Sequence, residues 1–165
     1  MEIIVRPANA NDLQEIQAIV NHAILHTTAN YNYEPQSLEA QQLWLEQKQS
    51  HHFPVLVAEW QNQVVGVGTY GTFREKTGYR FTVEHSVYVS EHHIGKGIGK
   101  QLLSELIVLA RSQNVHVMIG AIDAENTDSI AFHKKFGFTE SGTIKEAAFK
   151  FDRWLDLLFM QLILE

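Results

Sequence analysis

The chain has 165 residues, is 45% hydrophobic and carries a formal net charge of −6. These values suit one globular domain over residues 1–165, and the acidic balance gives no support to nucleic-acid binding. Cysteine is absent, which excludes a disulfide framework, a thiolate nucleophile and cysteine-ligated zinc. The charged N-terminus does not fit a signal peptide, and no apolar run reaches the ~18 residues that a membrane-spanning helix needs. We therefore expect a cytoplasmic protein without a membrane partner.

Helix caps and the spacing of apolar residues divide the chain into eleven elements. In the first half they are a strand at 3–6, a helix capped within 9–12 and reaching about 24, a helix at 37–49, and a hairpin of strands 55–60 and 64–70. After a polar loop, they are a strand at 81–89, a helix at 97–113, a strand at 115–122, a helix at 126–136, and strands at 138–144 and 154–164 around a loop. Gly137 is expected to end the fourth helix in the C′ position. This order predicts an α/β or α+β domain with a mixed sheet.

A glycine-rich loop, Gly95-Lys96-Gly97-Ile98-Gly99-Lys100, joins the strand that ends at Val89 to the following helix. Glycines let the backbone approach a ligand closely, while free N–H groups and the helix dipole attract phosphate oxygens. The loop is not a P-loop, because Gln101 stands where a hydroxyl residue is required, and it lacks the third glycine of a dinucleotide fingerprint. The residues alone therefore predict either an anion site or an ordinary strand-to-helix turn.

Two longer segments give this loop a context: VEHSVYVSEHHIGKGIGKQLL at residues 83–103 and IGAIDAENTDSIAFHKKFGF at residues 119–138. They resemble the GNAT superfamily of acyl-CoA-dependent N-acetyltransferases, and the resemblance covers nearly the whole chain. The segments NHAILHTTANYNYEP, TVEHSVYV, SIAFHKKFGF and KFDRWLDL are similar, within that superfamily, to phosphinothricin and methionine sulfoximine acetyltransferases. The resemblance implies a GNAT-like sheet, mixed and mostly antiparallel, twisted and flanked by helices.

The same resemblance implies an acetyl-CoA site, with acetyl-CoA as co-substrate and no metal. In this superfamily the strand before the loop presents backbone groups to the pantetheine arm, and the loop binds the pyrophosphate. Ile94 stands where the family favours Gln or Arg, so binding should rest on backbone N–H groups and lysines. Asn126 can cap its helix and, by resemblance, also contact pantetheine. The implied cofactor residues are Val87, Tyr88, Val89, Gly95, Lys96, Gly97, Ile98, Gly99, Lys100 and Asn126.

Two residues are candidates for the chemistry of an amine that attacks a thioester. Glu84 lies just before the cofactor-binding strand segment, and as a base it would take the proton of the amine, through water if the amine is distant. Burial would raise the pKa of this carboxylate from about 4.3, and the resemblance assigns it the same role. His133 stands four residues before Gly137, where the superfamily usually has a tyrosine that protonates the CoA thiolate. A histidine there could donate a proton or merely pack against pantetheine, and Glu84 could be a sheet-edge residue without chemistry.

A backbone N–H near Val87–Val89 is implied by the resemblance as the donor to the developing oxyanion. Around the loop before this strand, three cations lie within seven positions, which favours an anionic substrate or simply a solvated loop. The substrate contacts implied by the subgroup are Arg74, Glu75, Lys76, Arg80, Glu84, His85 and Ser86. Further candidates for the pocket are Tyr31, Tyr33, Phe73, Lys150, Arg153 and Trp154, the last three from the same or a partner subunit.

The expected function is direct acetyl transfer from acetyl-CoA to the α-amine of a small amino acid, such as L-methionine sulfoximine or phosphinothricin. The transfer is expected to be direct because there is no cysteine and no serine in a nucleophile-elbow pattern. Two alternatives stay open: a polyamine or peptide amine as acceptor, and a non-catalytic acetyl-CoA-binding sensor domain. The apolar segment 154–160 and the subgroup resemblance predict a homodimer. The pairs His51-His52 and His92-His93 are expected on the surface, without the spacing of a metal site.

Overall fold

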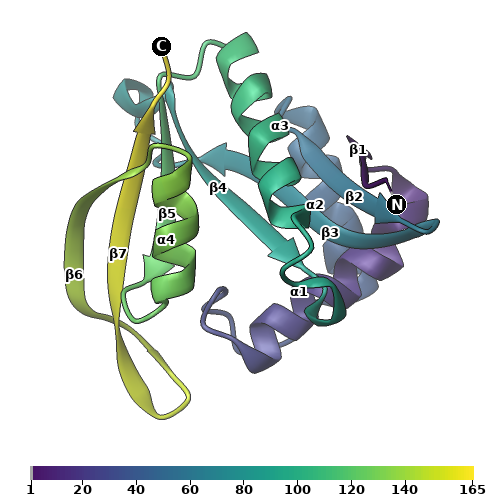
Figure 1. The fold of residues 1–165 in the computed structure, drawn as a ribbon, viewed down its shortest axis with the longest axis horizontal. Coiled ribbons are helices and arrows are strands. Elements are labelled where there is room, and N and C mark those ends of the chain that lie inside the picture. The colour runs from purple at the N-terminus through teal and green to yellow at the C-terminus, as the bar shows by residue number, and fades with distance from the viewer. Residues whose placement is uncertain (1) are drawn as a thin grey trace.

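The computed structural model describes residues 2–165, whose strands form one seven-stranded sheet in the order β1-β2-β3-β4-β5-β7-β6 (Figure 1). In chain order the elements are β1 (Ile4–Pro7), α1 (Leu13–His26), α2 (Leu38–Ser50), β2 (Val55–Trp60), β3 (Gln63–Thr72), β4 (Thr82–Val89), α3 (Ile98–Ser112), β5 (Val117–Asp123), α4 (Thr127–Lys135), β6 (Thr139–Lys150) and β7 (Arg153–Ile163). All neighbouring strands within this range pair antiparallel except β4 and β5, which run parallel. The mixed, mostly antiparallel sheet is thus confirmed.

The helices begin where the capping residues predict. Asn9 and Asp12 form a capping box, with the Asn9 side chain accepting from the backbone of Asn11 and Asp12 accepting from the N–H of Asn9. Ser37 accepts from the N–H of Ala40 at the start of α2. These side-chain acceptors satisfy N–H groups that have no partner within the helix, so the local sequence fixes the start of α2 and of the 3-10 turn at Ala10–Asp12 that leads into α1. Helix α3 begins after Gly97 without a side-chain cap.

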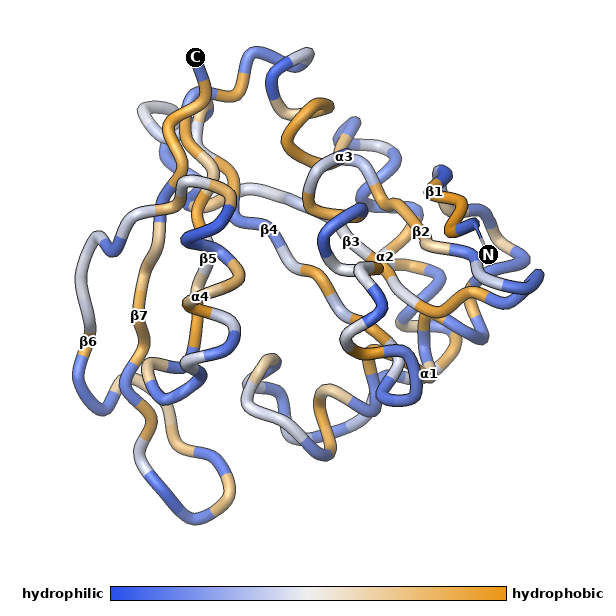
Figure 2. Tube along the Cα trace, viewed as in Figure 1, coloured by the Kyte–Doolittle hydropathy of each residue, from blue (hydrophilic) through white to orange (hydrophobic). Residues whose placement is uncertain are grey.

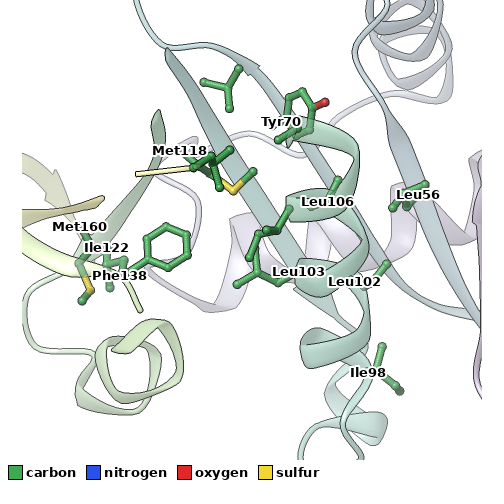
Figure 3. Packing of buried hydrophobic residues seen from close by; sticks show 14 of the residues in the cluster. Leu56, Tyr70, Ile98, Leu102, Leu103, Leu106, Met118, Ile122, Phe138 and Met160 are labelled. Atoms are coloured by element: carbon green, nitrogen blue, oxygen red, sulfur yellow. The ribbon is translucent and has the colours of Figure 1, made fainter. Parts of the chain in front are cut away.

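The helices cover both faces of the sheet, and each face has its own apolar cluster (Figure 1). On one face, Ile16 and Ile19 of α1 and Leu45 of α2 pack on valines of β2 and β3. On the other face, Leu103 and Leu106 of α3 lie opposite residues of β5 and the segment after α4, as Figure 3 shows for Met118, Ile122 and Phe138. Figure 2 shows the matching apolar colour along β2 and β5.

Close contact between α3 and the sheet depends on a glycine in β3, Gly66. A Cβ at Gly66 would lie 2.8 Å from Cγ2 of Ile98 and 3.0 Å from Cδ1 of Leu102. Such distances are too short for real Cβ contacts, so any larger residue would push the start of α3 outward. Because the glycine loop leads directly into this turn of α3, Gly66 also fixes where the loop lies.

The two last strands differ from the expectation that a loop separates Ile144 from Trp154. β6 continues to Lys150 through an irregular register between Ile144 and Ala148, and it joins β7 by a two-residue turn. Both turn residues, Phe151 and Asp152, have positive φ, 54° and 56°. This is the backbone that twisted two-residue hairpin turns require, and neither residue is the glycine that usually signals it. The prediction of a loop at 145–153 was therefore wrong.

None of the helices within residues 2–165 is long and apolar enough to cross a membrane.

Candidate active site

The strands β4 and β5 separate halfway along their length. Their parallel pairing extends only over Thr82–Glu84 on β4, opposite Val117–Ile119, while β4 stays paired with β3 as far as Val89. Figure 1 shows the two strands running apart beyond this point. At the separated end of β4, Ser90 donates its N–H to the carbonyl of Val65 on the β3 side. Since backbone groups alternate in direction along a strand, the N–H groups of Val87 and Val89 face the opening.

A cleft of about 910 Å³ occupies this opening. It is walled by the separated parts of β4 and β5, by the glycine loop and first turn of α3, by α4, and by the C-terminal part of α1. The cofactor residues predicted from the sequence that line it are Val87, Tyr88, Val89, Gly95, Gly97, Ile98, Gly99, Lys100 and Asn126. The structure therefore brings together nine of the ten residues that the resemblance implies.

The glycine loop forms an open backbone turn at one end of the cleft. Gly95 and Gly97 have φ of +82° and +81°, and a Cβ on either would have no atom within 4 Å. Positive φ is what requires glycine here, because the surrounding space would accept a side chain. The free N–H groups at the start of α3 lie beside these glycines, a geometry that suits phosphate oxygens. The donor set thus fits the pyrophosphate of acetyl-CoA.

The charged and bulky residues of the loop lie in different places. Lys100 lines the cleft, whereas the Nζ atom of Lys96 sits 4.4 Å from the centroid of the Trp60 ring, outside the lining. Ile94 lines the mouth and is 70% exposed, so it contributes little packing of its own. His93 is half-buried, lies edge-on to Trp60 and lines the cleft, in contrast to the surface position expected for it.

Helix α4 brings Asn126 and His133 to the opposite wall. The Asn126 side chain caps the helix by accepting from the N–H of Ser129. At the other end Gly137 has a φ of +93°, and the N–H of Phe138 returns to the carbonyl of His133, which confirms the C′ role of the glycine. His133 is buried and points toward β4 and β5, where a Cβ at Gly120 would lie 3.2 Å from its Nε2 atom.

His133 meets a second buried histidine, His85 of β4. Their Nε2 atoms are 3.0 Å apart, and Nδ1 of His133 lies 2.7 Å from the carbonyl oxygen of Ser129. A carbonyl only accepts, so Nδ1 of His133 carries the proton and its Nε2 accepts from Nε2–H of His85. Burial lowers the pKa of both rings, that of His85 to about 3. Two neutral rings in this tautomer leave His133 without a proton directed at the cleft.

Glu84 lies on the other face of β4, together with Ser86 and Tyr88. It is half-buried, and burial raises the pKa of its carboxyl group while the Lys48 ammonium of α2 opposes the shift. Ser86 and Tyr88 line the cleft two and four residues further along the strand, but Glu84 itself does not. The candidate base therefore lies outside the cleft lining, on the face of β4 that it shares with Ser86 and Tyr88.

The predicted substrate residues separate into two groups. His85 and Ser86 line the cleft, whereas the loop residues Arg74, Glu75, Lys76 and Arg80 are exposed and do not. The guanidinium groups of Arg74 and Arg80 lie over neighbouring aromatic rings, at 5.6 Å from Phe73 and 4.4 Å from Phe81. Within this chain, the cation loop is thus not brought into the cleft.

Of the further pocket candidates, Lys150 and Arg153 bond to other groups of the protein, and Trp154 is exposed. Nζ of Lys150 donates to the carbonyls of Ile24, Thr27 and Asn30 at 2.6, 2.6 and 2.5 Å and so ties the end of α1 to β6. Arg153 pairs with Glu125 at 2.9 Å, and Trp154 is 61% exposed.

The three aromatic residues predicted to wall the pocket, Tyr31, Tyr33 and Phe73, make separate contacts. Tyr33 donates to the carbonyl of Phe149, and Phe73 packs edge-on against Tyr79 and Phe159. The hydroxyl of Tyr31 is buried with no hydrogen-bond partner among the described residues. Of the two tyrosines, Tyr31 is therefore the one whose hydroxyl has no partner among the described residues.

Several residues that line the cleft were not predicted as site residues, although they lie in the segments that carry the resemblance: His22, Thr27, Thr28, Gly120, Asp123 and Phe132. They come from three elements that only the fold brings together. Asp123, for example, is buried and accepts from the Thr28 hydroxyl at 2.7 Å, which joins the segment after α1 to β5. No cluster of three or more potential metal ligands is found among residues 2–165.

A profile of the acetyltransferase (GNAT) domain matches residues 5–159. The L-methionine sulfoximine/L-methionine sulfone acetyltransferase of Pseudomonas paraeruginosa is 45% identical over 166 residues, which cover 100% of this chain and 96% of that protein. The structure of the Salmonella typhimurium yncA protein with its cofactor acetyl-CoA has a TM-score of 0.96 at 43% identity, covering 99% of this chain and 94% of that chain. A phosphinothricin acetyltransferase from Sinorhizobium meliloti in complex with acetyl-CoA has a TM-score of 0.95 at 38% identity, covering 99% and 89%. The chain therefore belongs to the GNAT family of acetyltransferases, enzymes that use acetyl-CoA.

Proposed function

We propose that the chain transfers the acetyl group of acetyl-CoA to the α-amino group of a small amino acid. The observation that carries this proposal is the cleft between the separated β4 and β5, which extends from the glycine turn to the strand that bears Glu84. Similar proteins named for methionine sulfoximine and phosphinothricin make these two compounds the acceptors to test first. Residues 1–165 would act as one domain in the cytoplasm.

The residues of the cleft match the parts of acetyl-CoA in order. The turn at Gly95 and Gly97, with the first N–H groups of α3 and Lys100, would hold the pyrophosphate. The backbone of Val87–Val89, which faces the opening, would pair with the amides of the pantetheine arm and donate to the carbonyl oxygen of the thioester. Asn126 and the neutral ring of His133 would flank that arm from α4.

The transfer needs one bond made, one bond broken and two protons moved. The neutral amine nitrogen attacks the thioester carbonyl carbon, and the collapse of the adduct breaks the C–S bond. Glu84 would take the proton that the ammonium must first lose, through water, because burial raises its pKa toward that of a useful base. The second proton leaves the nitrogen of the adduct and ends on the sulfur of CoA. A backbone N–H preorganised for the oxyanion can contribute roughly 3 kcal/mol.

Recognition of the acceptor would use His85, Ser86 and the cations of the loop 74–80. Because that loop is exposed in a single chain, its approach to the acceptor would depend on binding or on a second copy. Methionine sulfoximine and phosphinothricin both carry a carboxylate, which arginine binds well. A polyamine carries only positive charge, so Arg74 and Arg80 argue against it.

We expect a homodimer that uses the β6–β7 hairpin. Nearly all of β6 is exposed on both of its faces. Five large apolar residues of this part of the chain are at least 42% exposed: Ile144, Phe149, Phe151, Trp154 and Ile163. An apolar edge strand of this kind is usually covered. Sedimentation of the chain should give a dimer, and Trp154→Gln combined with Phe149→Gln should shift it to monomer. A chain that sediments as a monomer at all concentrations contradicts this assembly.

The decisive assay is thiol release from acetyl-CoA over a panel of amino acids, with spermidine and a short peptide included. Methionine sulfoximine or phosphinothricin should react fastest, and Glu84→Gln should lower kcat by roughly 10²–10⁴-fold. The matched control is Glu46→Gln, at an exposed position of α2. Faster reaction with spermidine would favour the polyamine alternative. Tight acetyl-CoA binding with no thiol released on any amine would favour the sensor alternative.

A further inference from the structure

A half-buried lysine of α2, Lys48, lies near Glu84. Nζ of Lys48 donates to the carbonyl of Tyr70 at 3.0 Å, and burial lowers the pKa of the amine to about 8. No carboxylate among the described residues lies within ion-pair distance of it. Its contacts are thus a carbonyl oxygen and the Phe53 ring, whose centroid is 5.6 Å away. Partly burying an ammonium without a carboxylate partner is costly, so its position requires a physical reason.

The space that this ammonium occupies is made by a glycine. A Cβ at Gly71 would lie 2.6 Å from Nζ of Lys48 and would meet no other residue within 4 Å. Gly71 is the cross-strand partner of Glu84 in the β3–β4 pair. Directly opposed residues of an antiparallel pair project on the same face, so Lys48 fills the side-chain position next to Glu84.

From this geometry we infer that Lys48 is a positioning residue that holds Glu84 in its ionised form, with Gly71 providing the space for it. The inference rests on the proposed role of Glu84 as the base. A base must be ionised before it can accept a proton, and burial in the sheet opposes ionisation. The ammonium of Lys48 offsets part of that effect without forming a direct ion pair, which would lock the carboxylate in place.

Few other titratable groups lie near enough to Glu84 to change the ionisation of its carboxyl group. On β4 itself, burial raises the pKa of the Tyr88 phenol, and the negative charge of Glu84 adds to that rise. On the side of β5, Ile119 stands beside it. The imidazole of His85 projects from the opposite face toward α4, and His22 of α1 faces Glu91 at 3.7 Å. On β3, the Tyr70 hydroxyl donates to Gln113 on the α3 side. Lys48 is therefore the cation that acts on Glu84 in the described part of the chain.

The test measures the pKa of Glu84 directly, by ¹³C NMR of the carboxyl carbon in glutamate-labelled protein. The resonance is assigned as the one that Glu84→Gln removes. Lys48→Met keeps the length of the side chain and removes the charge, so the midpoint should rise by about one pH unit. Lys48→Arg keeps a positive charge and should leave the midpoint near its original value.

Gly71→Ala provides an independent variant, because its methyl group should displace the ammonium at small cost. It should raise the midpoint in the parent protein and have no further effect when combined with Lys48→Met. The acid limb of the kcat/KM profile should move with the NMR midpoint, which packing alone would not cause. Far-ultraviolet circular dichroism and thermal unfolding verify that every variant is folded.

Failure of the inference differs from failure of the proposed function. An unchanged Glu84 midpoint in Lys48→Met, or an equal rise in Lys48→Arg, overturns the role of Lys48 even if Glu84→Gln abolishes turnover. A raised midpoint in Lys48→Met combined with full activity of Glu84→Gln supports the coupling and refutes Glu84 as the base.

Discussion

The pair of buried histidines predicts a loss of stability in mild acid. His85 has a pKa of about 3 in the folded chain, because the ring is buried and faces His133, against about 6.5 for an unfolded histidine. The unfolded state therefore binds more protons between these two values. The contribution to stability is complete above about pH 6.5 and is lost as the pH falls toward 3.

The magnitude follows from the two pKa values. Between pH 7.5 and pH 5.0, integration of the difference in proton binding for His85 alone gives about 2 kcal/mol of lost unfolding free energy. Since the pKa of His133 is lowered as well, that ring adds to the loss in the same direction. Other groups also titrate in this interval, so a variant has to isolate the contribution of the pair.

The assay is urea unfolding followed by tryptophan fluorescence at both pH values. His85→Gln retains an N–H donor for His133 but cannot be protonated, so it should lose about 2 kcal/mol less than the parent over the interval. His92→Gln is the control, because the His92 side chain is 80% exposed. If the parent and His85→Gln lose the same free energy, the two rings are not held neutral and the tautomer assignment is wrong.

Four further outcomes are expected. Gly66→Ala should destabilise the fold by about 1–3 kcal/mol in urea unfolding because its Cβ meets Ile98, whereas Gly78→Ala, with open space around it, should not. Gly97→Ala forces a side chain into positive φ at a strain of about 1–3 kcal/mol, and calorimetry should show weaker acetyl-CoA binding. Lys150→Met leaves three carbonyls without their donor, so amide exchange in residues 24–30 should accelerate, and unchanged protection contradicts that role. Ile94→Gln should leave acetyl-CoA affinity unchanged or modestly tighter, because the backbone turn carries the binding.

The order of elements follows from local sequence because its causes are local. Asn9 and Ser37 accept from N–H groups two or three residues away, and Gly137 supplies the positive φ that ends α4. The β6–β7 turn was not predicted, because its cause is not local. Phe151 and Asp152 adopt positive φ without glycine, and the pairing of two long strands, rather than the preference of the turn residues, holds them there.

The glycine loop and the segments around it determine, from the sequence alone, a GNAT acetyltransferase with an acetyl-CoA cleft. Only the tertiary structure decides where β4 leaves β5, and therefore which backbone groups face the cleft. It also decides that His85 meets His133 across 48 positions of sequence, and that Lys48 fills the space left by Gly71, the cross-strand partner of Glu84. Such contacts depend on which strands become neighbours. Burial then shifts the pKa of each group, and burial cannot be read from the residues next to it in the sequence.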